Sequence, residues 1–133
     1  MRRLLLCLLA SGLPIACSSA PPDNGNKAVQ SERWATPIKH DANLYRIDDK
    51  LYRSEQPVAE DGEAIVKLGI QSVINLRFFD RNDDDHLKAY GLTLLNRPLL
   101  SWSIKPKEIA EILYLIEKQQ QNGAVLIHCY HGA

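Results

Sequence analysis

The sequence carries no excess charge of either sign. Its 16 lysine and arginine residues are balanced by 16 aspartate and glutamate residues, so the formal net charge is zero. Nucleic-acid binding normally appears as a surplus of basic residues. The balance therefore gives no reason to expect a nucleic-acid partner. A length of 133 residues with an apolar fraction of 45% is typical of one globular domain.

The sequence also lacks an apolar run long enough to span a membrane. Residues 1–16 begin with Met1-Arg2-Arg3 and continue as an apolar stretch to about Ala16, whereas a spanning helix needs about 20 residues. A short basic region followed by a short apolar one is typical of a secretory signal peptide. We therefore exclude residues 1–16 from the fold and expect an exported protein.

The end of this segment resembles the lipobox of bacterial lipoproteins, because the small residue Ala16 follows an apolar run and directly precedes Cys17. The resemblance implies that Cys17 carries lipid and anchors the mature chain to a membrane. The serine after Cys17 favours the outer membrane, on the periplasmic side. Ordinary cleavage after Ala20 is the alternative. Residues 17–42 are mostly polar and are predicted to form a flexible tether, which leaves residues 43–133 as the domain.

Cysteine is scarce, and its positions exclude an internal disulfide. Cys7 would be removed with the signal peptide and Cys17 would carry lipid, so only Cys129 keeps a thiol. A single thiol in an exported protein is a candidate reactive group. A buried structural cysteine is the alternative.

Alternating hydrophobicity, apolar runs and helical periodicity predict strands that alternate with helices, which indicates an α/β fold. Ile109, Ile112, Leu113 and Ile116 form one helical stripe, and the wholly apolar run 124–127 predicts a strand at the centre of a parallel sheet. The predicted strands are 44–47, 51–54, 72–77, 92–99 and 124–127, and the predicted helices are 59–68, a short one ending at Tyr90, and 106–122.

The chemistry is expected directly after the last strand, because ligands of open α/β sheets bind at the carboxyl ends of strands. Cys129 lies there, and Gly132 permits a tight turn whose backbone N–H groups can face an anion. Such donors also favour a thiolate, which would make Cys129 a nucleophile toward phosphorus.

The run His128-Cys129-Tyr130-His131-Gly132 resembles the signature loop of the cysteine-based protein tyrosine and dual-specificity phosphatases. The stretches 51–57 and 69–77 are similar to the bacterial branch of that family. The resemblance implies a phosphatase-like sheet flanked by helices, no cofactor, and a phosphorylated protein or small phosphomonoester as substrate. It also implies that Cys129 is the nucleophile, that His128 supports the loop and favours the thiolate, and that Tyr130, His131, Gly132 and Ala133 bind phosphate.

The sequence departs from that family in two ways. The family's loop continues to an arginine that binds the phosphoryl oxygens. The chain as written stops at Ala133, before the position of that arginine. We therefore expect a truncated chain that lacks the C-terminal helices, folds poorly and is inactive. The family also supplies a general-acid aspartate from the loop before its last helix. Residues 99–107 contain no carboxylate, and Glu108 is the nearest candidate for the general acid.

Three other interpretations compete with catalysis of phosphate release. The missing acid and arginine favour a non-catalytic lipoprotein module that binds phosphate or a partner. A rhodanese-like sulfurtransferase also places a cysteine loop after a strand. The spacing of Asp80, Asn82 and Asp84 suggests calcium, but Asp85 stands where a calcium loop has glycine and Gly91 where it has glutamate, so a solvated turn is predicted and no metal site.

Overall fold

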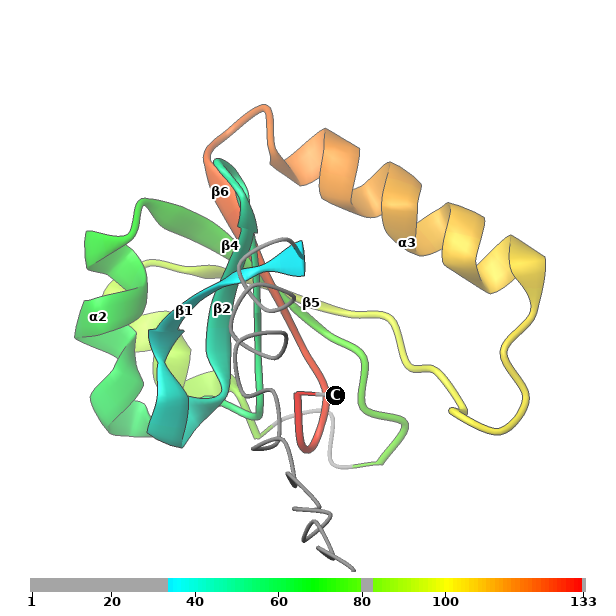
Figure 1. The fold of residues 1–133 in the computed structure, drawn as a ribbon, viewed down its shortest axis with the longest axis horizontal. Helices are drawn as coiled ribbons and strands as arrows, with labels where there is room; N and C mark the ends of the chain where they lie inside the picture. Colours follow the sequence, from blue (N-terminus) through cyan, green and yellow to red (C-terminus); the bar gives the residue numbers. More distant parts are fainter. Residues whose placement is uncertain (1–33, 80–82, 133) are drawn as a thin grey trace, which may run out of the picture.

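The computed structural model describes residues 34–79 and 83–132, which form a single sheet with helices on both of its faces (Figure 1). The six strands are β1 (Thr36–Lys39), β2 (Leu44–Asp48), β3 (Leu51–Ser54), β4 (Ile70–Asn75), β5 (Thr93–Asn96) and β6 (Ala124–His128). The α-helices are α2 (Gly62–Lys67) and α3 (Pro106–Gln119), and the 3-10 helices are η1 (His40–Ala42), η2 (Ala59–Asp61) and η3 (Asp85–Tyr90).

The sheet is antiparallel on one side and parallel on the other. Its strand order is β1-β2-β3-β6-β4-β5, and β6 runs parallel to both β3 and β4. The central parallel position predicted for residues 124–127 is therefore confirmed. The hairpin predicted from residues 44–54 is confirmed as well, because β2 and β3 pair antiparallel.

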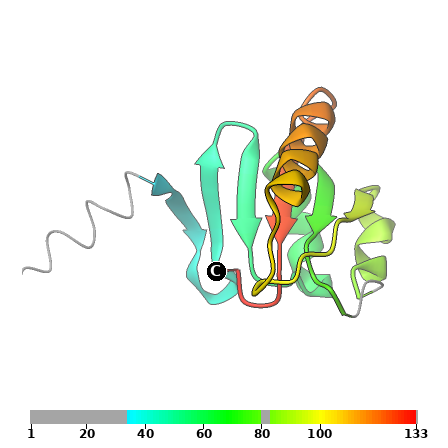
Figure 2. The ribbon, with the colours of Figure 1, turned by 90° about the vertical axis from the view of Figure 1, so that its right-hand side faces the viewer.

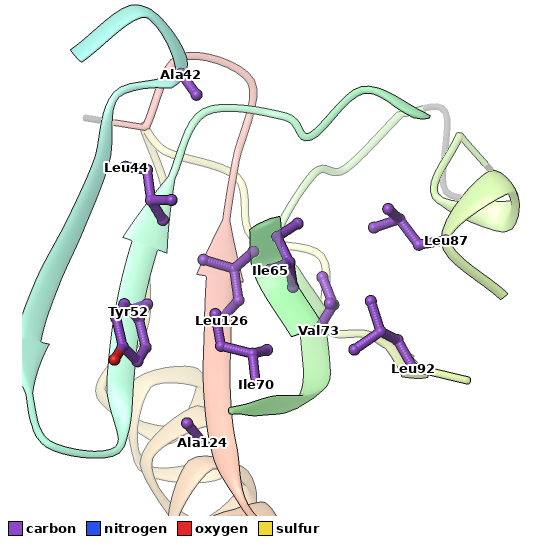
Figure 3. Packing of buried hydrophobic residues seen from close by; sticks show 10 residues of the cluster. All are labelled: Ala42, Leu44, Tyr52, Ile65, Ile70, Val73, Leu87, Leu92, Ala124 and Leu126. Atoms are coloured by element: carbon purple, nitrogen blue, oxygen red, sulfur yellow. The ribbon is translucent and has the colours of Figure 1, made fainter. Parts of the chain in front are cut away.

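Two layers of apolar side chains hold the helices to the sheet. Successive residues of a strand point to opposite faces, so Leu126 packs in the cluster that contains Ile65 of α2, whereas Val125 packs with Ile112 and Ile116 of α3. Figure 3 shows the first cluster, in which Leu126 and Ile65 lie beside Val73 of β4. On β6, Ala124, Val125 and Leu126 are buried and Ile127 is partly buried against the second cluster, which fixes the position of the segment that follows the strand.

The structure differs from the sequence-based expectations in the amino-terminal segment and on α3, and several strand and helix bounds differ by a few residues. The tether was predicted to reach residue 42, but β1 pairs with β2 through Thr36 and Arg46. The polar composition of this segment suits a strand at the edge of the sheet, where most side chains are exposed. The helical stripe on α3 is also only half buried, because Ile109 is 40% and Leu113 60% exposed. No helix within residues 34–79 and 83–132 is both long and apolar enough to cross a membrane.

Candidate active site

Cys129 directly follows His128, the last residue of β6. Figure 2 shows that β6 lies in the middle of the sheet and that the chain turns back directly after it. Neighbouring strands end at the same level, since His128 pairs with Ser54 of β3 and with Asn75 of β4. The N–H of Leu76 donates to the carbonyl of His128 at 2.8 Å, which ties the end of β6 to the chain leaving β4. Cys129 is half-buried and forms no disulfide. A half-buried thiol on a rigid strand end is both positioned and reachable.

The loop after Cys129 is held from its outer side by its carbonyl groups. Three donors bind three successive carbonyls: the N–H of Gln56 binds Tyr130 at 3.4 Å, Nδ2 of Asn43 binds His131 at 2.7 Å, and the guanidinium of Arg53 binds Gly132. The C=O and N–H of a trans peptide point in opposite directions. Fixing the carbonyls of Tyr130 and His131 outward therefore turns the N–H groups of His131 and Gly132 inward, and the N–H of Gly132 lies 3.2 Å from Sγ of Cys129.

Glycine is required at position 132 for two independent reasons. Its φ of +71° lies in the left-handed region that favours glycine. A Cβ atom there would lie 2.5 Å from the backbone nitrogen of Glu55 and 2.6 Å from the carbonyl carbon of Ser54. The loop therefore packs directly on the backbone that follows β3, and a side chain at position 132 would push it away.

His128 is buried beneath the loop, between two oxygen atoms. Its Nδ1 lies 3.2 Å from the carbonyl oxygen of Cys129, and its Nε2 lies 2.9 Å from Oδ2 of Asp84. Asp84 precedes η3 and is itself buried. The structure thus brings the predicted loop residues together and adds a carboxylate that was expected to lie in a solvated turn.

Arg77 lies against the loop from the side of β4. Its side chain is buried, forms an ion pair with Oδ2 of Asp83 at 2.8 Å and donates to the side-chain oxygen of Gln56. The guanidinium carbon sits 4.7 Å from the centroid of the Tyr130 ring, within the range of a cation–π contact. The hydrogen bonds from Arg77 and Gln56 hold the pKa of Asp83 below its ordinary value.

A groove of about 510 Å³ opens beside the thiol. Its lining is rich in exposed aromatic rings, with Trp102 77% and Phe79 67% exposed, and it also includes Cys129, Tyr130, Phe78 and Arg77. One wall is the segment between β5 and α3, which has no carboxylate. The groove therefore suits an aromatic group whose phosphate reaches the cysteine loop.

The candidate acid Glu108 has a local structural role. Its Oε2 accepts the N–H of Lys105 at 2.7 Å and caps the first turn of α3. Glu108 is absent from the lining of the groove.

Several of the predicted site residues lie outside the part of the chain that the structure describes. The lipidation residue Cys17 and the last loop residue Ala133 lie outside the described residues, as do Asp80 and Asn82 of the calcium-like spacing. Asp84, the third member of that spacing, is engaged with His128. Within the described part of the chain, no three His, Cys, Asp or Glu side chains are grouped so as to hold a metal ion.

The sequence reading missed the residues that support the loop, namely Asn43, Arg53, Gln56 and Asp84. Arg53 and Gln56 lie inside the stretch 51–57 that resembles the phosphatase family, so that resemblance was the available signal. No sequence signal identified Asn43 or Asp84. Asn43 binds His131, which is 88 residues away in the chain, and Asp84 binds His128, which is 44 residues away.

Sequence comparison relates the chain to a bacterial phosphatase. No family model matches it. The curated protein "Dual specificity protein phosphatase TpbA" of Pseudomonas aeruginosa is 29% identical over 105 residues, which cover 79% of this chain and 47% of the relative. The chain thus spans about half the length of the curated relatives that it matches.

Comparison of structures leads to the same proteins. The crystal structure of P. aeruginosa TpbA superposes with a TM-score of 0.71 at 28% identity and covers 77% of this chain and 63% of that one. A TpbA variant in complex with phosphotyrosine gives 0.70 at 27% identity, covering 77% and 62%. A putative phosphatase from Neisseria meningitidis gives 0.58 at 26% identity, covering 68% of each chain. The predicted α/β fold and the predicted relationship are therefore confirmed: the chain is a homologue of the dual-specificity phosphatase TpbA and has the fold of the cysteine-based tyrosine phosphatases.

Proposed function

We propose that the protein hydrolyses phosphate monoesters, with Cys129 as the nucleophile. The observation that carries the proposal is the orientation of the loop. The N–H of Gly132 points at Sγ of Cys129, and the outward-held carbonyl of Tyr130 turns the N–H of His131 to the inner side of the loop. A phosphoryl group placed over Sγ would meet donors that stabilise its developing negative charge.

The reaction proceeds in two balanced displacements. The Cys129 thiolate attacks phosphorus, an S–P bond forms, and the P–O ester bond breaks with its electron pair going to the leaving oxygen, which takes a proton from solvent water. Water then attacks the phosphocysteine, the S–P bond breaks, and inorganic phosphate and the thiolate are released. The N–H groups of the loop donate to phosphoryl oxygens in both steps.

The proposed substrate is phosphotyrosine in a protein or peptide. Phe79, Trp102 and Tyr130 surround the approach to the thiol, and aromatic side chains pack favourably on an aromatic ring. The related TpbA has been crystallised as a variant in complex with phosphotyrosine, which is consistent with this choice.

The test is release of phosphate from p-nitrophenyl phosphate and from a phosphotyrosine peptide by the full-length protein. The inactivity expected above concerns residues 1–133 alone, so the assay uses the protein with its complete cysteine loop, and we expect turnover that is lost in Cys129→Ser. Binding of vanadate without turnover would instead support the non-catalytic module, and transfer of sulfur from thiosulfate to cyanide would support the sulfurtransferase. Either result, with no phosphate released, would refute the proposal.

We further propose that the amino-terminal segment exports the protein and that Cys17 carries lipid, which would tether the domain to the periplasmic face of a bacterial outer membrane. The support is the sequence pattern around Ala16-Cys17. Metabolic labelling with an alkyne fatty acid is expected to mark the wild type and to fail with Cys17→Ser. Labelling that persists in this variant would refute the anchor, and recovery of an unlabelled wild type from the periplasm would favour cleavage after Ala20.

A further inference from the structure

The surroundings of His128 constrain the protons on its ring. Nδ1 faces the carbonyl oxygen of Cys129, and Nε2 faces a carboxylate oxygen of Asp84. A carbonyl oxygen only accepts hydrogen bonds, and so does an ionised carboxylate. A neutral imidazole has a single N–H and can satisfy one of these oxygens, whereas the doubly protonated ring satisfies both.

Burial strengthens this conclusion. The side chains of His128 and Asp84 are 0% and 5% exposed, so neither is solvated by bulk water. The second oxygen of Asp84, Oδ1, has no hydrogen-bond partner within the described structure. An isolated buried carboxylate is strongly unfavourable, so Asp84 must either carry a proton or pair with a cation. The His128 ring, whose Nε2 lies 2.9 Å from Oδ2 of Asp84, is the group that can serve as this cation when it is protonated.

Asp83, the residue before Asp84, is also linked to the cysteine loop. Asp83 pairs with Arg77, whose guanidinium lies over the ring of Tyr130. Two consecutive carboxylates are therefore linked to the cysteine loop. Asp84 contacts His128, which precedes Cys129, and Asp83 pairs with Arg77, which stacks on the ring of Tyr130. These two contacts explain why the acidic residues Asp83 and Asp84 lie next to the loop.

We propose that Asp84 is a positioning residue for the nucleophile: it holds His128 as an imidazolium, which fixes the carbonyl of Cys129 and stabilises the thiolate next to it. The inference rests on the proposed function only in taking Cys129 as the nucleophile. It extends that function by assigning a role to a carboxylate that touches neither substrate nor thiol.

Other charged groups near the loop set the background for this effect. Arg53 contacts the loop from β3, Glu55 follows that strand, Arg77 approaches from β4, and His131 lies within the loop. None of these is changed by a substitution at position 84. A comparison of variants that differ only there therefore isolates the contribution of the Asp84–His128 pair.

The experiment measures alkylation of Cys129 by iodoacetamide as a function of pH, on the full-length protein, with the site of labelling assigned by peptide mass spectrometry. Asp84→Asn removes the charge while keeping an oxygen that can accept from Nε2. Asp85→Asn is the matched control, because Asp85 is one position along, exposed, and paired with Lys88 on the surface. Thermal unfolding of each variant reports whether it is folded.

We expect Asp84→Asn to move the pH of half-maximal alkylation upward by about one unit or more, because a His128 that is no longer held as a cation withdraws positive charge from beside the thiolate. Asp85→Asn should leave it in place. A merely structural role would change the rate equally at every pH and leave the midpoint unmoved. Equal midpoints in a folded Asp84→Asn and in Asp85→Asn would overturn the proposal.

A second measurement covers the case in which Asp84→Asn does not fold. The ¹⁵N resonances of the His128 ring in the wild-type protein at pH 7 should show both nitrogens protonated, and a neutral tautomer would overturn the proposal. Alkylation requires no phosphate release, so an inactive protein that still shows the midpoint shift would refute the phosphatase function and leave the role of Asp84 intact.

Discussion

Replacing Gly132 with alanine tests the packing of the cysteine loop directly. The structure assigns two penalties to this change. A left-handed φ of +71° disfavours any residue with a Cβ atom by roughly 1–2 kcal/mol. The new methyl group would also lie 2.5 Å from the backbone nitrogen of Glu55, where neither backbone can yield easily. Overpacking of this kind adds about 1–3 kcal/mol.

Gly69 is the matched control for the first penalty alone. Its φ is +78°, and a Cβ atom there would meet nothing within 4 Å. Gly69→Ala should therefore lower the free energy of unfolding by the backbone term only, and Gly132→Ala by about 1–3 kcal/mol more.

The two variants should differ in activity as well as in stability. Displacement of the loop from the backbone of Ser54 and Glu55 breaks its carbonyl contacts, including the one to Arg53. Urea denaturation gives the free energies, and hydrolysis of p-nitrophenyl phosphate gives kcat/KM. Equal destabilisation by the two substitutions, with full activity in Gly132→Ala, would refute the reasoning that the loop rests on this backbone.

Three further predictions follow from particular contacts. Ile112→Ala should destabilise the protein by about 2–5 kcal/mol in urea denaturation, since Ile112 is buried, whereas the half-exposed Ile109 of the same helix should tolerate alanine far better. Trp102→Ala should reduce kcat/KM for aryl phosphates more than for alkyl phosphates, because Trp102 lines the groove. Trp34→Ala is the control and should leave both values of kcat/KM unchanged, because Trp34 is exposed and absent from that lining. The folded-state pKa of Asp83 is lowered, so its pairing stabilises the protein above the ordinary value of 3.8 and is lost as the pH falls below it. The stability curves of wild type and Asp83→Asn should accordingly converge in acid, and a constant difference at all pH values would contradict this.

Local sequence patterns were sufficient to predict the parts of the fold that are buried or regularly spaced. The run 124–127 before Cys129 predicted a central strand because all of its residues are apolar, and β6 occupies that position. Proline at the first turn and the apolar stripe predicted α3. Gly91, with its positive φ, ends η3 where a helix stop was expected.

The features that the sequence did not predict depend on contacts between distant residues. β1 is only four residues long and mostly exposed, so its pairing with β2 rather than a local pattern identifies it as a strand. Asp84 belongs to an acidic run that suggests a solvated turn, yet His128 supplies the partner that permits its burial. The roles of Asn43 and Arg53 as loop supports were not predicted, because both side chains bind backbone carbonyl groups. Only Arg53 lay in a stretch that resembles the phosphatase family.

The central claim is that Cys129 carries the phosphoryl group during turnover. The most direct test is a rapid denaturing quench of the full-length protein reacting with a phosphotyrosine peptide, followed by mass spectrometry of the peptide that contains Cys129. We predict a phosphoryl group on the sulfur of Cys129, absent in Cys129→Ser. Phosphate release that continues in Cys129→Ser, or a phosphoryl group trapped on another residue, would contradict the account.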